Sequence, residues 1–451
     1  MQESNSTAQP RVCSIPAEIP KEPFSATRRE TVFAPVSFLL GWCYANICLR
    51  AYYEAEQQTV YLLILTALLT VCAEHMYSGR KRSFESWLIL VCFLTCSVAL
   101  ALSNLYYWKN VFTYPYEFDR VWDQGQMFLF VHLFFVWYVL SRSGKMLEGE
   151  TGHLLPADVL DAFVIIPLGS LFLRIRTLLF GVKKLFAKSE KEGSRQFPWM
   201  SVLAVVLSMG ILAAAVSLLM QADESFSRIF EDIYDFFYFE LDEIFMMQLV
   251  FSIPVGAWLW GLMGGSCRYK DETLISRRSG IYAVLRDIKK VSAKVWTFVI
   301  ALFSVVYILF FAIQGTYLFS AFIGKLPEGF IVSEYARRGF IELCKVMALN
   351  FLLLWLATRS VDDQTRESKG FKTACLVLLG ESMLFSLVSI SKLVLYISSF
   401  GITPLRIQSS WLAAVLFTAC AMWMYSLLTG KKVFKYWMYF GALTLTALAV
   451  I

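Results

Sequence analysis

Eleven runs of predominantly apolar residues, each close to the length of a membrane-crossing helix, constrain the fold of this chain more than any other feature. They cover about residues 33–50, 59–76, 87–107, 125–142, 199–220, 244–264, 296–320, 343–358, 373–399, 410–428 and 434–451. An α-helix needs roughly 20 apolar residues to cross a bilayer core of about 30 Å, and it satisfies its own backbone hydrogen bonds in lipid. The runs therefore predict an all-α fold, a polytopic transmembrane helical bundle of about 11 spans.

The composition agrees with this fold class and excludes several other kinds of protein. Hydrophobic types make up 57% of the chain and charged types 17%, whereas soluble domains carry roughly 25% charged residues. A chain this apolar is not a soluble globular enzyme, a nucleic-acid-binding protein or a disordered polypeptide. We expect its partners to include membrane lipids and to include no nucleic acid.

The first 30 residues differ from the rest of the chain. They are polar, mixed in charge, and contain Pro10, Pro16, Pro20 and Pro23. Such a composition cannot bury enough apolar surface to fold, and no signal peptide is visible. We therefore expect a disordered cytoplasmic tail over residues 1–30 and a single multi-span membrane domain over residues 31–451.

Segment 155–188 is apolar but is better described as an amphipathic helix than as a further span. Its apolar residues recur at helical spacing; they are Phe172, Ile175, Leu178, Leu179, Val182, Leu185 and Phe186. Arg174, Lys184 and Lys188 fall on the opposite side. This pattern predicts an interfacial helix whose basic residues lie against anionic lipid headgroups.

The distribution of charge among the loops predicts the orientation of the chain. Loop 265–294 carries eight basic and three acidic residues, Lys289 and Lys290 among them, whereas loop 221–243 carries eight acidic residues and one basic residue. Cytoplasmic loops are enriched in Lys and Arg. We therefore expect a basic cytoplasmic loop over 265–294, an acidic external loop over 221–243, the N-terminus inside and the C-terminus outside.

Loop 265–294 also contains a second basic amphipathic pattern. Its apolar positions are Ile281, Val284, Leu285, Ile288, Val291 and Val295. Together with segment 155–188, this helix could dock on anionic lipid, and it could equally bind a cytoplasmic or membrane protein partner. Both alternatives stay open at this stage.

Three motifs in the C-terminal half occur in a recognisable order. They are Q-x-x-Y-L-F at 314–319, E-Y-A-R-x-G-F at 334–340 and Y-x-x-x-x-G-x-T-x-x-R at 396–406. In this order they resemble a bacterial family of polytopic membrane proteins known only as a domain of unknown function, and the resemblance covers loosely the last two-thirds of the chain. Arg338 departs from the acidic or small residue usual at its position. The resemblance implies a bacterial cytoplasmic membrane and no established activity.

Ionisable and polar residues at membrane depth are the best leads to a functional site, because each is costly in lipid unless it is paired or hydrated. A stripe on the helix after residue 332 contains Glu334, Arg338, Glu342 and Lys345, with Tyr335 and Arg337 beside it and Asn350 deeper in the span. It either lines a polar vestibule or forms an internally paired ladder that fixes the helix orientation. Same-helix partners for nearly every charge favour the ladder.

Glu381 and Lys392 form a second group on a single predicted span. They lie 11 residues apart, which places them on one face at a separation of roughly 16 Å. They could line a proton or ion path, or form interhelical salt bridges. Gln314 and Arg406, both from the motifs, complete the candidate residues for a substrate or ion path.

Motifs of known catalytic or metal chemistry are missing from the sequence. The ten cysteines form no C-x-x-C pair and the three histidines are scattered, so we expect no metal, no cofactor and no disulfide framework. Glu54 and Glu56 form a short acidic pair in the first external loop. Three functions stay open: transport or lipid and envelope handling, a non-catalytic membrane sensor or assembly partner, and an enzyme on lipid-linked substrates.

Overall fold

The structure, a computed structural model, is all-α, as the sequence predicts. It describes residues 24–49, 55–109, 117–191, 207–219 without 209 and 213, 243–323 and 331–450, and these residues form no β-strand. The predicted acidic loop 221–243 lies almost wholly outside the described residues. Half of the predicted span 199–220 and Glu54 of the acidic pair in the first external loop also lie outside them.

The helices form two bundles, each around its own apolar core. The first contains α1 (Arg28–Phe33), α2 (Val36–Leu49), α3 (Ala55–Met76), α4 (Phe84–Lys109), α5 (Glu117–Ser143), α6 (Leu155–Leu160), the π-helical turn η2 (Asp161–Ile165), α7 (Ile166–Gly169), α8 (Leu173–Lys191) and α11 (Glu243–Arg268). The second contains α13 (Ala293–Phe319), the short 3₁₀ turn η3 (Ser320–Ile323), α14 (Val332–Ser360), α15 (Lys369–Phe400) and α16 (Pro404–Thr429). Helix α12 (Asp271–Ile288) connects them, and α17 (Phe434–Val450) packs against α4 and α16.

Eight of the described helices are long and apolar enough to cross a membrane, namely α3, α4, α5, α11, α13, α14, α15 and α16. The number becomes nine if the segment 155–169 and the following α8, bent by 43° relative to each other, form one span. The predicted count of about 11 is therefore not confirmed. Helix α2 has only 14 residues and α17 only 17. Of the remaining predicted span, 199–220, half lies outside the described residues, and Gly210–Leu219 counts only as a shorter apolar helix.

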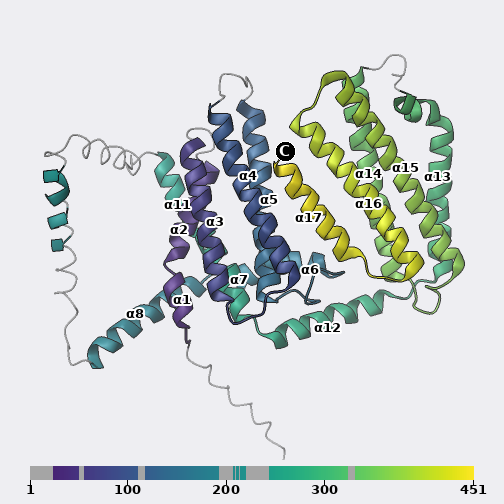
Figure 1. Cartoon of the computed structure of the whole chain (residues 1–451). Coiled ribbons are helices and arrows are strands. Elements are labelled where there is room, and N and C mark those ends of the chain that lie inside the picture. The colour runs from purple at the N-terminus through teal and green to yellow at the C-terminus, as the bar shows by residue number, and fades with distance from the viewer. Residues whose placement is uncertain are drawn as a thin grey trace, which may run out of the picture.

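The basic segments gather at one end of the long helices, the end at which α3, α5 and α11 all finish. Figure 1 shows the α3–α4 connection, α8, α12 and the α16–α17 connection at the lower end of the bundles. In the same view α1 begins at the lower end and α17 finishes at the upper end. The side of the membrane on which each loop lies stays a prediction from the loop charges.

Two glycines allow the closest helix contact of the first bundle, between α2 and α11. A Cβ atom on Gly41 would lie 2.2 Å from the Ser252 carbonyl oxygen, and one on Gly256 would lie 2.4 Å from the Ser37 carbonyl oxygen. Helices in lipid associate through such small residues, because apolar side chains gain little by leaving lipid for one another. Pro254 lies in α11 beside this contact.

A buried carboxylate connects α17 to the first bundle. Glu85, in the first turn of α4, is 3% exposed. It accepts hydrogen bonds from Trp137 Nε1 at 2.7 Å, from Tyr439 Oη at 2.9 Å, and from the backbone N and Oγ1 of Thr151 at 3.0 and 2.6 Å. Four donors compensate the burial of the charge. Glu85 therefore holds α4, α5, α17 and the loop after α5 together.

Helix α12 joins the two bundles at their lower end. Its start is paired with the first bundle through Asp271 and Lys145 at 2.5 Å and through Arg277 and the buried Asp161 at 2.5 Å. The residues that follow it join the second bundle, because Lys289 contacts Asp363 at 2.8 Å. Figure 1 shows α12 lying across the lower end of the helices. The predicted basic amphipathic helix in loop 265–294 is thus present and is anchored at both ends.

Two segments differ from their predicted boundaries. The interfacial segment 155–188 is not one helix, since it consists of α6, η2, α7 and α8, and Gly261 of α11 packs directly against its Pro167. Residues 24–30, assigned by sequence to the tail, pack on the first bundle instead. Their Glu30 is 4% exposed and bound to Arg268 of α11 at 2.6 Å.

The α2–α11 contact yields a stability prediction. Replacing Gly256 with Ala places a methyl group 2.4 Å from a backbone oxygen, so we expect destabilisation of about 1–3 kcal/mol from overpacking. Thermal unfolding of the purified protein in detergent measures this change. Gly280→Ala in α12 is the matched control, since nothing lies within 4 Å of its Cβ; an equal effect of both substitutions would contradict the close contact.

Candidate functional site: a groove between two helices

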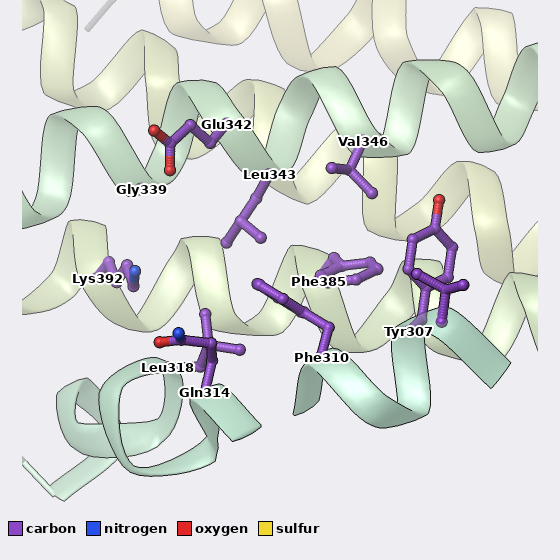
Figure 2. Close-up of a pocket in the computed structure, with 11 residues that line it drawn as sticks. Tyr307, Phe310, Gln314, Leu318, Gly339, Glu342, Leu343, Val346, Phe385 and Lys392 are labelled. Atoms are coloured by element: carbon purple, nitrogen blue, oxygen red, sulfur yellow. The ribbon is translucent and has the colours of Figure 1, made fainter. Parts of the chain in front are cut away.

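A groove of about 450 Å³ lies in the second bundle, along α15 and between α13 and α14. Its volume falls in the range of roughly 300–1,000 Å³ that is usual for small-molecule sites. Figure 2 shows three apolar side chains, Phe310, Leu343 and Phe385, in the middle of the groove. Lys392 and Gln314 lie at one end and Tyr307 lies at the other.

Lys392 is the cation at the polar end of the groove. The residue is 1% exposed, and its ammonium nitrogen lies 4.2 Å from the centre of the Tyr335 ring. A cation over an aromatic face is stabilised by the ring electrons. Glu342, which lines the same end, adds a favourable charge interaction with Lys392. The ammonium group is therefore kept at membrane depth by an aromatic ring and an acidic neighbour.

Gly339 makes the position of Lys392 possible. A Cβ atom on Gly339 would lie 2.5 Å from Lys392 Nζ and 3.0 Å from its Cδ. The lysine side chain thus occupies the space that any other residue at 339 would fill. The E-Y-A-R-x-G-F motif supplies both this glycine and the tyrosine under the ammonium group, so the motif forms one wall of the lysine pocket.

The opposite end of the groove is a hydrogen-bonded polar cluster. Asn350 is fully buried; it accepts a hydrogen bond from Tyr307 Oη at 2.6 Å and donates one to Ser382 Oγ at 3.0 Å. It therefore ties α13, α14 and α15 together near the middle of the span. Both carboxyl oxygens of Glu381 are buried there, near Tyr307 and Ser304, and neither meets hydrogen-bond geometry with a partner in the described part of the chain.

Arg406 was predicted to belong to a substrate or ion path, but it does not line the groove. It closes the turn between α15 and α16. Its Nη1 donates hydrogen bonds to the carbonyl oxygens of Phe400 at 2.9 Å and Gly401 at 2.6 Å. Its guanidinium carbon lies 4.1 Å from the centre of the Tyr396 ring. Gly401 has φ +79°, a left-handed conformation that suits glycine at a helix end. The third motif thus forms a helix cap.

The predicted charge stripe does not converge on the groove as a whole. Of its residues, Glu342 lines the groove, whereas Glu334, Arg337 and Lys345 are exposed and do not line it. The Arg338 side chain lies outside the described residues. The structure therefore brings together Gln314, Tyr335, Glu342 and Lys392 at one end and Asn350 and Glu381 near the other.

Of the residues predicted to contact the lipid surface, some are exposed and others make contacts within the protein. Lys184 and Lys290 are exposed, Lys289 is paired with Asp363, and the Lys188 side chain lies outside the described residues. Arg174 is only 4% exposed. It stacks on the Phe38 ring at 4.3 Å and donates a hydrogen bond to the Ile253 carbonyl oxygen at 3.2 Å, so it packs between α2 and α11 instead of facing headgroups.

Sequence reasoning missed the residues that shape the groove, Gly339 and Phe385 in particular. Gly339 belongs to the E-Y-A-R-x-G-F motif, but its role depends on Lys392, which lies 53 residues further along the chain. Phe385 had no signal of its own, because an aromatic residue in an apolar run is usual. Only the packing of α13 and α14 on α15 reveals both roles.

The fold and the groove define a multi-pass helical membrane protein. The chain belongs to the family described as a domain of unknown function (DUF4153), whose family model matches residues 63–451. This agrees with the resemblance seen in the sequence. Comparison with curated proteins and with solved structures finds no match for the chain.

The hydrogen bonds of Arg406 yield a prediction about the stability of the protein. Replacing Arg406 with Lys removes the paired hydrogen bonds and the planar stacking that a guanidinium provides. We expect a loss of about 1–2 kcal/mol in the free energy of unfolding, measured by thermal unfolding in detergent. Lys345→Gln, which removes an exposed charge from α14, is expected to leave it unchanged. Equal stability of the Arg406→Lys variant and the unmodified protein would contradict the capping role.

Proposed function

We propose that the chain handles membrane lipid by holding an amphiphilic lipid with an anionic headgroup in the groove between α13 and α14. The observation that carries this proposal is the buried Lys392 at one end of an otherwise largely apolar groove. Tyr335 and Glu342 already stabilise the ammonium group, and an anionic headgroup at the same end would add a further favourable charge interaction. The apolar middle of the groove suits an acyl chain, and the lysine end suits a negatively charged headgroup.

The arrangement of the helices supports access from the lipid phase. Both α13 and α14 pack extensively on α15, so α15 forms the floor and the other two helices form the walls. Val306 and Phe310, which line the groove on α13, are 54% and 38% exposed. A ligand could therefore enter sideways from the bilayer without crossing the aqueous phase.

The end of the groove with Lys392 lies near one surface of the membrane. Lys392 is eight residues from the end of α15, or about 12 Å along the helix axis. The opposite surface carries the basic segments α8 and α12. By the positive-inside rule we place these segments in the cytoplasm, the N-terminus inside, the C-terminus outside, and the headgroup end of the groove in the outer leaflet of a bacterial cytoplasmic membrane.

The lysine gives the direct test of this proposal. Replacing Lys392 with Met keeps the length of the side chain and removes its charge, so we expect about tenfold less binding of an anionic lipid. The measurement is photo-crosslinking of a phosphatidylglycerol analogue with a photoreactive acyl chain to the full chain in phosphatidylcholine vesicles. The labelled peptide is expected to contain residues from 306–318 or 339–346.

Two further variants sharpen this experiment. Val346→Trp fills the groove and leaves Lys392 in place, so we expect it to reduce crosslinking of phosphatidylglycerol and phosphatidylcholine analogues alike. Lys345→Met is the matched control, since Lys345 is exposed on the same helix and does not line the groove. Undiminished crosslinking in both the Lys392→Met and Val346→Trp variants would refute the proposed lipid site.

The orientation has its own test. In a chain whose ten native cysteines have been replaced, Ser333→Cys at the start of α14 is expected to react with a membrane-impermeant thiol reagent on intact cells. Gly280→Cys in α12 is expected to react only after the membrane is permeabilised, because the positive-inside rule places α12 in the cytoplasm. The reverse pattern would show that the chain is inserted the other way.

A further inference from the structure

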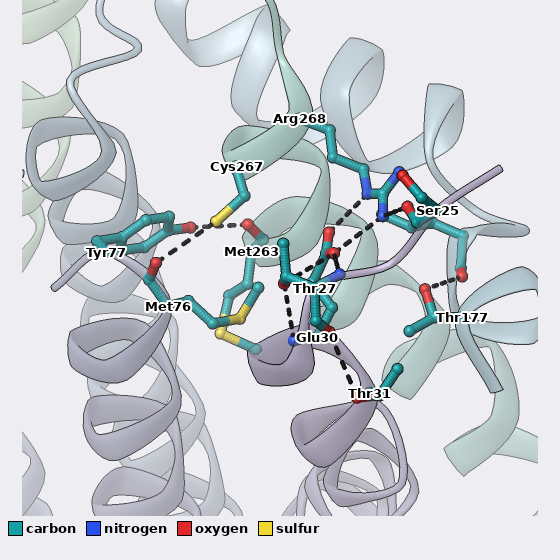
Figure 3. A network of polar contacts seen from close by, with 11 residues as sticks. Ser25, Thr27, Glu30, Thr31, Met76, Tyr77, Thr177, Met263, Cys267 and Arg268 are labelled. Atoms are coloured by element: carbon teal, nitrogen blue, oxygen red, sulfur yellow. Dashed lines mark hydrogen bonds and ion pairs between the residues drawn. The ribbon is translucent and has the colours of Figure 1, made fainter. Parts of the chain in front are cut away.

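A second cavity lies at the lower end of the first bundle, far along the chain from the groove. It has a volume of about 710 Å³ and lies between the segment that leads into α1, the end of α3 and the end of α11. Its apolar side is formed by Met76, Tyr77 and Cys267. Figure 3 shows the polar network that borders it, with Arg268 reaching from α11 to the α1 segment.

The lining of this cavity is strongly cationic. Four arginines, Arg28, Arg29, Arg80 and Arg268, face a single acidic residue, Glu30, which leaves an excess of three positive charges. Arg28 and Arg29 form no ion pair or side-chain hydrogen bond with another described residue, and both are exposed to the cavity side of α1. Concentrated positive charge of this kind attracts anions.

Specific hydrogen bonds and an ion pair fix one border of the cavity. Arg268 donates from Nε to Glu30 Oε1 at 2.6 Å and from Nη2 to Glu30 Oε2 at 2.9 Å. Glu30 also forms a capping box with Thr27 at the start of α1. Burial alone would raise the pKa of Glu30, but the hydrogen bonds from Arg268 and Thr27 outweigh it and lower the pKa, so the carboxylate is ionised at neutral pH.

Two more contacts fix the opposite border. Tyr77 Oη donates a hydrogen bond to the Met263 carbonyl oxygen at 2.9 Å, which joins the end of α3 to α11. The Arg80 guanidinium donates to the Ser143 carbonyl oxygen and lies 3.9 Å from Asp271. Asp271 is itself bound to Lys145 at 2.5 Å, so the local positive charge exceeds the negative charge on this side as well.

We propose that this cavity binds a phosphate monoester, with Arg28 and Arg29 as its main contacts and Arg80 beside them. A phosphate monoester carries close to two negative charges and accepts paired hydrogen bonds from guanidinium groups. The cavity lies where two membrane-crossing helices end, so the phosphate could belong to a lipid headgroup or to a soluble metabolite. The proposal is independent of the groove between α13 and α14.

The test uses two probes that share the phosphate monoester and differ in their acyl chains. Phosphatidic acid is added to the full chain in detergent and counted by native mass spectrometry, and glycerol 3-phosphate is titrated while the melting temperature is recorded. The counterparts without a phosphate monoester are phosphatidylcholine, whose phosphodiester is balanced by a quaternary ammonium group, and uncharged glycerol. The double variant Arg28→Gln with Arg29→Gln is expected to bind the effective probe about tenfold more weakly than the unmodified chain.

A matched variant separates a specific site from general attraction by charge. Arg278→Gln with Lys290→Gln removes two exposed positive charges around α12, outside the cavity. We expect this control to bind as the unmodified chain does, and Arg29→Gln alone to show a smaller loss than the double variant. If the unmodified chain binds phosphatidic acid and the double variant binds it more weakly, the site is assigned to a lipid. If the unmodified chain responds only to glycerol 3-phosphate, the site is assigned to a soluble compound. Equal binding by all variants, or binding of neither probe, would overturn the proposal.

Discussion

Interhelical contact in lipid is the constraint on which the rest of this structure depends. Apolar side chains gain little by exchanging lipid for one another, so the helices are held by contacts that lipid cannot offer. In the first bundle these are the backbone approach at Gly41 and Gly256 and the four hydrogen bonds to Glu85. In the second bundle Asn350 joins three helices. Each of these contacts uses a polar or small residue whose partner lies far away in the sequence.

The two candidate sites use the same principle for different purposes. In the groove a glycine leaves space for a buried lysine, and an aromatic ring and a carboxylate stabilise the charge. At the lower end of the first bundle, an ion pair between Glu30 and Arg268 fixes one border of the cavity. Arg28 and Arg29 line the cavity without an ion pair to another described residue. One site lies among apolar walls at membrane depth, and the other lies where α3 and α11 end. Both proposals name a negatively charged ligand, which gives them a common chemistry.

The motifs of the C-terminal half acquire distinct roles in the folded chain. Gln314 and Leu318 of the first motif and Gly339 of the second line the groove, and Tyr335 of the second lies under Lys392. The third motif contributes a turn, with Gly401 in a left-handed conformation and Arg406 bound to the last carbonyl groups of α15. An arginine in a motif suggested a ligand contact, whereas its hydrogen bonds show a helix cap. Residues close together in a motif are thus divided between the site and its support.

The sequence by itself determined the fold class, the positions of most helices and the gathering of basic segments, because apolar run length and loop charge are local properties that lipid and water sort directly. The helix boundaries of α15, predicted over 373–399 and found at Lys369–Phe400, show how far this goes. Only the tertiary structure decided that Arg174 is buried, that residues 24–30 join the first bundle and that Lys392 meets Gly339 and Tyr335. Those outcomes depend on which helix faces pack together, and that choice arises from contacts between residues far apart in the chain.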